Sequence, residues 1–231
     1  MLLLAIDTST WAGSIALFDD QSGIIAEYCL INTVTHSERL LGSIDLVLGQ
    51  AQSKLDDIDV LAATVGPGSF TGLRIGVSTI KGLAYASQKK IASVSTLEVM
   101  ARAFPFIPAI ICPLMDAKKK EVFTCLYKWQ EDTLVPLMPE SCVKPASLVS
   151  KIKALESDVI FVGDGLDIYG TMLRDELQDR VKMAPSVFFY PRAAIVALLG
   201  CEYAKAGKLS DPADVVPRYL RASDAELHFK G

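Results

Sequence analysis

Histidines and paired cysteines are scarce in this sequence. The chain of 231 residues has two histidines, His36 and His228, and they lie far apart. Its five cysteines are scattered, odd in number, and form no Cys-x-x-Cys pair. We therefore expect neither a disulfide framework nor a structural zinc site.

The sequence also lacks a long apolar run. Hydrophobic residues make up 51% of the chain and the mean hydropathy is +0.33. Even so, no segment approaches the roughly 18–20 apolar residues that cross a bilayer. The apolar opening, residues 1–6, is too short for a signal-peptide core and follows no basic region. These absences predict a soluble, cytoplasmic protein without membrane contact.

A strong excess of basic residues is absent as well. The formal net charge is −4 and the pI is about 5.3, so an unaided grip on nucleic acid is not expected. One short basic run, Lys118–Lys120, stands out. A solvated hairpin turn is the simpler interpretation of this run, and a contribution to a basic surface shared with a partner is the alternative.

The first part of the chain predicts three strands followed by alternating helices and strands. An unbroken apolar run ends at Asp7, as a strand buried on both faces would. Thr35 and Glu38 form a capping box at the start of a helix with a strongly apolar face. The elements expected are strands at 2–6, 14–18, 24–30, 59–66 and 91–95, and helices at 36–51, 71–87 and from Thr96.

The second part predicts the same order again. A strand at 109–116 ends at Asp116, as the first strand ends at Asp7. The remaining elements expected are strands at 121–129, 133–138, 158–165 and 186–190, and helices at 145–155, 166–177 and 191–207. Two prolines within residues 101–108 mark the boundary, which predicts halves at 1–103 and 104–231. The C-terminal segment has the alternative of packing back on the first half.

A glycine-rich turn between the strand at 59–66 and the helix at 71–87 has the chemistry of an anion cradle. Gly66, Gly68 and Gly72 permit close backbone approach, and Ser69 and Thr71 offer hydroxyls beside a helix N-terminus. The turn is not a P-loop, because no Gly-Lys-Ser/Thr closes it, and it is not a Gly-x-Gly-x-x-Gly motif. A tight turn with close helix packing is an equally good interpretation.

Two other strand ends also allow both a ligand-binding and a structural interpretation. Asp7, with Thr8 and Ser9, would order a metal-bound water beside a phosphate, or would cap an Asx-type turn. Gly163 and Gly165 would let a nucleotide base lie on the backbone, or would simply turn the chain. Ligands of open α/β sheets bind beyond the carboxyl ends of the strands, so these signals together predict a cleft between the halves.

Several stretches of the sequence resemble one family. The doubled βββαβα order resembles the α/β fold of the actin/hexokinase/sugar-kinase (ribonuclease H-like) superfamily. Within that fold the chain is similar, nearly end to end, to the TsaB (YeaZ) family, with Lys118 where that family usually has arginine. The stretches that carry the similarity are LLAIDTST, THSERLL, GPGSFTGLRIGVSTIKGLA, VSTLE, MDAKKKEV and VVPRYLR.

The resemblance implies a non-catalytic, activating subunit for threonylcarbamoyl transfer to the adenosine next to the anticodon of tRNAs that decode ANN codons. Its implied partner is the catalytic subunit TsaD, with the ATPase TsaE joining the pair. TsaD has two metal-binding histidines where this chain has Thr96 and Met100, so no metal site is expected. We expect no tightly bound cofactor, and ATP or ADP with magnesium only at a site shared with the partner.

The resemblance further implies that the helices at 36–51 and 71–87 contact TsaD, or a second copy of this chain in a homodimer. Transfer RNA would be bound only through the complex. Leu40, Ile44, Val47 and Leu48 are expected to divide between core and interface. The residues implied for the interface are His36, Glu38, Arg39, Leu40, Ile44, Val47, Leu48, Arg74, Val77 and Lys81.

Two other functions compete with this one. A stand-alone small-molecule kinase or ATPase of the same fold would use Asp7 and the glycine loops, with Asp116 as the best available base. A protease is not expected, because the chain has no His-Glu-x-x-His motif and no serine or cysteine nucleophile in a recognisable context.

Overall fold

The structure is a computed structural model. It describes residues 1–31 and 36–221, and for residues 36–38 it describes the backbone alone. The chain forms two compact units. Among the described residues, the first consists of those within Met1–Val99 and Pro191–Tyr219, and the second of Met100–Tyr190 with Leu220 and Arg221. The division predicted from the sequence assigns residues 191–219 to the second half; they belong to the first unit, as in the alternative that the C-terminal segment packs back on the first half.

The first unit is built on a five-stranded sheet in the order β3-β2-β1-β4-β5. The strand β1 is antiparallel to β2 and parallel to β4, because a helical crossover leads into β4. The alternation of side chains along β1 sends Leu4 and Ile6 to one face and Leu3 and Ala5 to the other, and both faces are buried. The strands are β1 (Leu2–Asp7), β2 (Ala12–Asp19), β3 (Gly23–Ile31), β4 (Val60–Gly66) and β5 (Ile91–Ser95).

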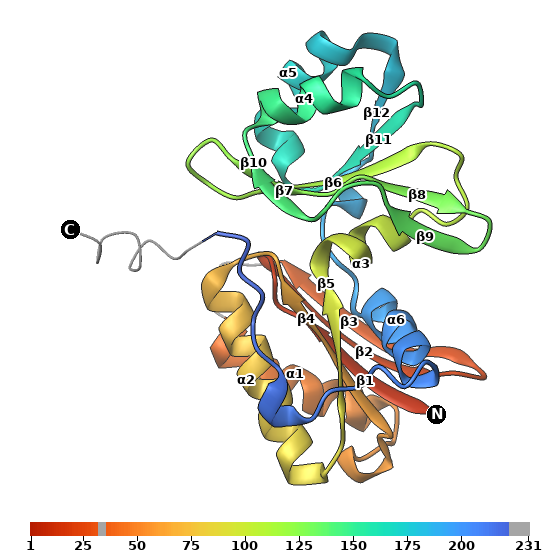
Figure 1. Ribbon diagram of the computed structural model, residues 1–231. Coiled ribbons are helices and arrows are strands. Elements are labelled where there is room, and N and C mark those ends of the chain that lie inside the picture. The colour runs from red at the N-terminus through yellow and green to blue at the C-terminus, as the bar shows by residue number, and fades with distance from the viewer. Residues whose placement is uncertain (32–35, 222–231) are drawn as a thin grey trace. The chain divides into compact units, whose positions relative to one another are not determined.

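Helices cover both faces of this sheet (Figure 1). The helices α1 (His36–Gln50) and α2 (Phe70–Ser87) pack on the face of Leu4 and Ile6. The helix α6 (Ala193–Lys205) packs on the face of Leu3 and Ala5. The helix α3 (Thr96–Arg102) follows β5 and carries the chain into the second unit.

The second unit repeats this design. Its sheet has the order β10-β7-β6-β11-β12, which matches the first sheet strand for strand, and a hairpin of β8 and β9 is added to it. One core joins the sheet to α4 (Pro145–Lys153) and α5 (Gly165–Leu177). The strands are β6 (Ile110–Asp116), β7 (Val122–Thr124), β8 (Tyr127–Gln130), β9 (Thr133–Pro136), β10 (Ser141–Val143), β11 (Val159–Val162) and β12 (Val181–Met183).

This repetition confirms the predicted fold class, two similar βββαβα halves. The helix α6, although it comes last in the chain, closes the first unit because its apolar side chains complete the core beside β1. None of the helices within residues 1–31 and 36–221 is long and apolar enough to span a membrane.

Several element predictions in the second half were wrong. The strand expected at 121–129 is broken at Cys125 and Leu126, where the chain leaves β7 and begins β8. The apolar run at 186–190 forms no strand: its start is a 3-10 turn, Ser186–Phe188, and Val187 is exposed. Prolines on both sides of this run limit its pairing, and β12 supplies the outer strand instead. The predicted capping box of Thr35 and Glu38 lies outside the described residues.

Candidate functional site

The turn after β1 is polar and almost completely buried. Asp7, Thr8, Ser9 and Thr10 are all buried, although polar side chains at a sheet edge are usually exposed. The Asp7 Oδ1 atom accepts hydrogen bonds from the Ser9 hydroxyl at 2.7 Å and from the Thr64 hydroxyl of β4 at 2.6 Å. This is the geometry of a side chain that caps a turn and ties it to the neighbouring strand.

The glycine-rich loop packs directly on that turn. A Cβ atom on Gly68 would lie 2.3 Å from the Ser9 carbonyl oxygen, and one on Gly72 would lie 2.0 Å from the Thr8 carbonyl oxygen. The next glycine along α2, Gly76, is equally close to the Thr8 hydroxyl, at 2.2 Å. The glycines therefore meet a packing requirement of the chain itself, because any side chain would separate α2 from the turn.

Donors at the start of α2 are already used within the chain. The Ser69 N–H donates to the Ser9 carbonyl oxygen at 2.7 Å, and the Ser69 hydroxyl caps the helix by accepting from the Gly72 N–H at 3.2 Å. The side chain of Thr71 is exposed. This region has the composition of an anion cradle, but at least two of the N–H groups that would bind an anion are bonded internally.

The second unit carries the counterpart of this edge. Gly163 adopts φ +125°, as Gly66 adopts φ +124° in the first unit. A Cβ atom on Gly163 would lie 2.4 Å from the Leu114 carbonyl oxygen, and one on Gly165 would lie 2.8 Å from the same atom. Both glycines are thus needed for the close approach of β11 and α5 to β6.

A charged cluster lies at the end of β6. The Asp116 N–H donates to Asp164 Oδ1 at 3.1 Å, and Lys118 Nζ lies 2.6 Å from Asp116 Oδ2. Burial raises the pKa of Asp164, and the hydrogen bond to Asp116 raises the pKa of Lys118. The lysine thus forms an ion pair with the carboxylate that the kinase interpretation needs as a base.

The structure gathers the predicted site residues into two groups. Asp7, Thr8, Ser9 and the Gly66–Gly72 loop meet in the first unit, and Asp116, Gly163 and Gly165 meet in the second. Thr96 is fully buried in the first unit, and Met100 is buried in the second. Within residues 1–31 and 36–221, no three His, Cys, Asp or Glu side chains gather closely enough to hold a metal ion.

Five of the ten residues predicted for the interface lie in the core. Leu40, Ile44, Val47 and Leu48 do not divide between core and surface, because all four are buried against the first sheet, as is Val77 of α2. Arg39 is half-buried, and the side chains of His36 and Glu38 lie outside the described set.

The two basic residues predicted on α2 contact the chain's own C-terminal segment. Lys81 Nζ donates to the carbonyl oxygens of Ala213 and Val215, at 3.3 and 2.9 Å. The guanidinium of Arg74 lies 3.9 Å from the centre of the Phe70 ring, and its Nε donates to the Tyr219 hydroxyl at 3.3 Å. Of these two, Arg74 is exposed and Lys81 is half-buried.

The outer surface of α1 and α2 carries apolar residues that we did not predict as surface residues. Leu41 and Leu46 of α1 are 58% and 48% exposed, and Tyr85 of α2 is 60% exposed. Three helical glycines lie exposed on the same two helices, and a Cβ atom on any of them would meet no atom of residues 1–31 and 36–221 within 4 Å; they are Gly42, Gly49 and Gly82. We call these six residues the outer helix face. The sequence pattern that could have indicated this face is glycine within apolar helices, together with leucines outside the apolar side that packs on the sheet.

Comparisons with known proteins agree with this architecture. A family model described as TsaD, tRNA N6-adenosine threonylcarbamoyltransferase, matches residues 19–229. The tRNA threonylcarbamoyladenosine biosynthesis protein TsaB of Bacillus subtilis is 31% identical over 229 residues, which cover 99% of this chain and 98% of that protein. The chain belongs to the TsaB (YeaZ) family.

Other TsaB relatives support the assignment. The TsaB protein of Escherichia coli is 30% identical over 241 aligned positions, covering 100% of this chain and 99% of that protein. A crystal structure from Pseudomonas aeruginosa, described as an uncharacterized protein with similarity to peptidase YeaZ, superposes with a TM-score of 0.81. It is 28% identical and covers 95% of this chain and 99% of its own. The TsaB family thus shares both the fold and the length of this chain.

Proposed function

We propose that this chain acts in the biosynthesis of tRNA threonylcarbamoyladenosine as a non-catalytic, activating partner of TsaD. Its relatives in Bacillus subtilis and Escherichia coli are named for this biosynthesis. The family model that it matches describes the transferase itself. The observation that carries the proposal is the outer helix face of α1 and α2.

The outer helix face has the composition of a helix-packing surface. An exposed glycine within a helix costs about 0.5–1 kcal/mol relative to alanine, and no neighbour among the described residues requires glycine at Gly42, Gly49 or Gly82. Such positions allow the backbone of another helix to approach closely. The exposed side chains of Leu41, Leu46 and Tyr85 supply apolar area around them. We propose that two helices of TsaD cover this face.

The non-catalytic role is supported by the hydrogen bonds at the polar end of the first sheet, which are made within the chain. The Asp7 carboxylate accepts from Ser9 and Thr64, and the Ser69 and Gly72 N–H groups are bonded within the chain. In the second unit, Asp116, the best candidate for a base, is held in an ion pair with Lys118. We therefore propose that ATP or ADP with magnesium is held only at a site shared with TsaD.

The outer helix face also accounts for a homodimer of this chain. In the absence of TsaD, two copies of the chain would pair through α1 and α2 as a homodimer, because a two-fold interface uses one surface twice. TsaE would join the pair of this chain and TsaD. Transfer RNA would be bound by the complex.

The first experiment is size-exclusion chromatography with light scattering on this chain and TsaD from the same source, with and without ATP and Mg²⁺. A Leu46→Asp variant introduces a charge on the outer helix face without entering the core. We expect it to weaken the heterodimer about 100-fold or more, because a buried unpaired carboxylate is costly. Threonylcarbamoyl transfer to tRNA, measured on the same mixtures, should fall with it.

The matched control is Ile168→Asp, which places a charge at an equally exposed helical position, in α5 of the second unit. It should assemble with TsaD and support transfer like the unsubstituted chain. A wild-type chain that ignores TsaD under every condition, including with TsaE added, would contradict the proposal. ATP turnover by the lone chain, abolished by Asp7→Ala, would support the kinase interpretation instead.

A further inference from the structure

A lysine-rich hairpin connects β6 to β7 in the second unit. Its three residues, Lys118, Lys119 and Lys120, adopt φ values of +61°, +53° and +62°. Each left-handed residue that is not glycine costs about 1 kcal/mol, so asparagine or glycine would be the less costly choice at these positions. Strain held at three successive exposed lysines is a reason to ask what their charges do.

The conformation of this hairpin is held by contacts at both of its ends. The Ala117 N–H donates to the Glu121 carbonyl oxygen, and the Glu121 N–H donates to the Lys118 carbonyl oxygen, both at 3.0 Å. On the other side, Arg221 Nη1 donates to the Ala117 carbonyl oxygen at 2.5 Å. The tip, Lys119 and Lys120, is therefore presented on a fixed base.

The carboxylates at the base of the hairpin each lie beside a cation. Asp116 pairs with Lys118 at 2.6 Å, and Glu121 pairs with Arg221 at 3.5 Å. Asp164 is half-buried and accepts the Asp116 N–H, and desolvation raises the pKa of its carboxyl group. The tip thus adds two exposed lysines to a base in which two of the three carboxylates are ion-paired.

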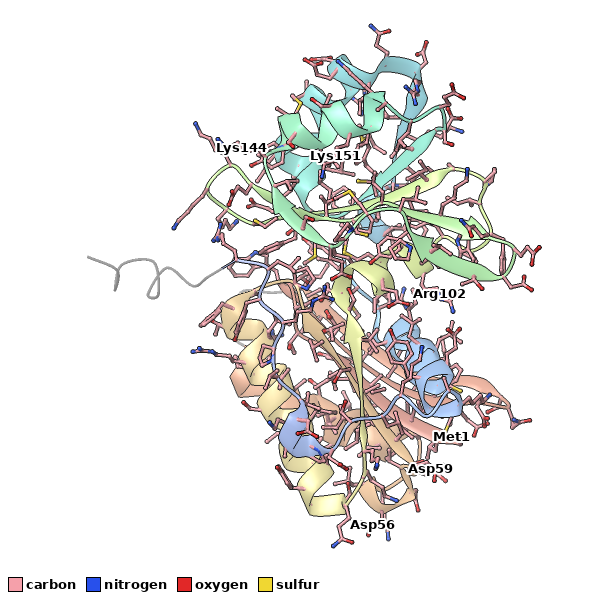
Figure 2. All side chains as sticks on the ribbon, in the orientation of Figure 1. Met1, Asp56, Asp59, Arg102, Lys144 and Lys151 are labelled. Carbon is pink, nitrogen blue, oxygen red and sulfur yellow. The ribbon has the colours of Figure 1, made fainter. Side chains whose placement is uncertain are left out.

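Another exposed lysine, Lys144, lies at the same end of the sheet. The strand β10 pairs antiparallel with β7, with Val143 opposite Val122, so Lys144 follows β10 where Glu121 precedes β7. Figure 2 labels Lys144 at the start of α4. Within the described residues, Lys120 and the ammonium group of Lys144 make no hydrogen bond or ion pair. We call Lys119, Lys120 and Lys144 the basic tip cluster.

We infer that the basic tip cluster binds the phosphate backbone of the tRNA on which the proposed complex acts. The inference rests on the proposed function. Exposed lysines around a rigid turn suit sequence-independent contacts to successive phosphates, which position an RNA without reading its bases. The chain as a whole is acidic, at −4, so this contact contributes to binding only together with the partner's surface.

The test uses the complex of this chain with TsaD and an unmodified tRNA transcript that decodes an ANN codon. A Lys119→Gln/Lys120→Gln variant removes two charges and keeps side-chain length. We expect the Kd for tRNA to rise about five- to tenfold. The slope of the logarithm of the association constant against the logarithm of the salt concentration is negative, and we expect its magnitude to fall by about 1.5. A Lys119→Arg/Lys120→Arg variant should bind like the unsubstituted complex.

Two controls separate this inference from the proposed function. Lys205→Gln/Lys208→Gln removes the same charge from the end of α6 in the first unit and should leave the tRNA Kd unchanged. Light scattering on every variant reports assembly with TsaD. If assembly and transfer fail already with the unsubstituted chain, the proposed function is wrong. If the complex forms and the hairpin variant binds tRNA as tightly as the control, the inference is wrong. Loss of assembly in the hairpin variant alone would show that the cluster binds protein, which also overturns it.

Discussion

The hydroxyl of Thr8 donates a hydrogen bond of 2.7 Å to the carbonyl oxygen of Gly72, 64 residues further along the chain. The Thr8 carbonyl oxygen lies only 2.0 Å from where a Gly72 Cβ atom would be. The end of β1 and the start of α2 are therefore in backbone contact. A glycine-rich loop that looks like a ligand cradle in the sequence is here a packing surface.

This contact predicts a large difference between two glycines of the same helix. Gly72→Ala should lower the free energy of unfolding by about 3 kcal/mol, since backbone atoms must separate to admit the methyl group. Gly82→Ala, which meets open space, should raise it by about 0.5–1 kcal/mol. Urea denaturation at a concentration where the chain is monomeric measures both, and equal effects would contradict the packing role of Gly72.

The buried carboxylate of Asp7 depends on its donor in the next strand. Thr64→Val removes the hydroxyl that donates to Asp7 Oδ1 while keeping the shape of the side chain. We expect a loss of about 1–3 kcal/mol in the free energy of unfolding, because a buried acceptor loses one of its donors. Thr64→Ser keeps the donor and should cost about 1 kcal/mol, for the lost methyl group. The expectation fails if the valine variant is the more stable of the two in thermal unfolding.

The N-terminus of α6 is capped by side chains from distant strands. Ser14 Oγ of β2 accepts from the Ala193 N–H at 2.9 Å, and Glu27 of β3 accepts from the Ala194 N–H at 3.1 Å and pairs with Arg192. Ser14→Ala should cost about 1 kcal/mol and speed hydrogen exchange at the start of α6. The control is Ser150→Ala, at an exposed serine of α4. Similar exchange rates in both variants would argue against this cap.

The pH dependence of stability should report on Asp164. Burial raises its pKa above the ordinary value of 3.8, so the folded protein binds this proton more tightly than the unfolded chain does. The resulting stabilisation is fully present below pH 3.8 and is lost as the pH rises through the raised pKa. Asp164→Asn keeps an acceptor for the Asp116 N–H and carries no charge. Its melting temperature, relative to that of the unsubstituted chain, should therefore rise between acidic and neutral pH. A constant difference across that range would contradict the burial of a charged Asp164.

Local signals in the sequence were sufficient for much of the fold. An unbroken apolar run that ends in aspartate predicts β1, and its counterpart predicts β6, because a strand buried on both faces needs apolar residues at every position. Glycines and hydroxyls after β4 predict the turn into α2 for the same local reason. The doubled order, and with it the fold class, follows from these signals.

Other features were decided by contacts between distant residues. Apolar residues lie on both the inner and the outer side of α1. The sequence alone therefore could not show that Ile44 packs on the sheet while Leu46 faces outward. Nor could it show that α6 returns to the first unit, which depends on the space beside β1 and on caps from Ser14 and Glu27. The glycine-rich loop shows the difference most clearly. Its own residues determine its conformation, but it becomes a packing surface only because Thr8 and Ser9 lie against it. Residue type and spacing set the local conformation, whereas burial depends on what a distant segment brings against it.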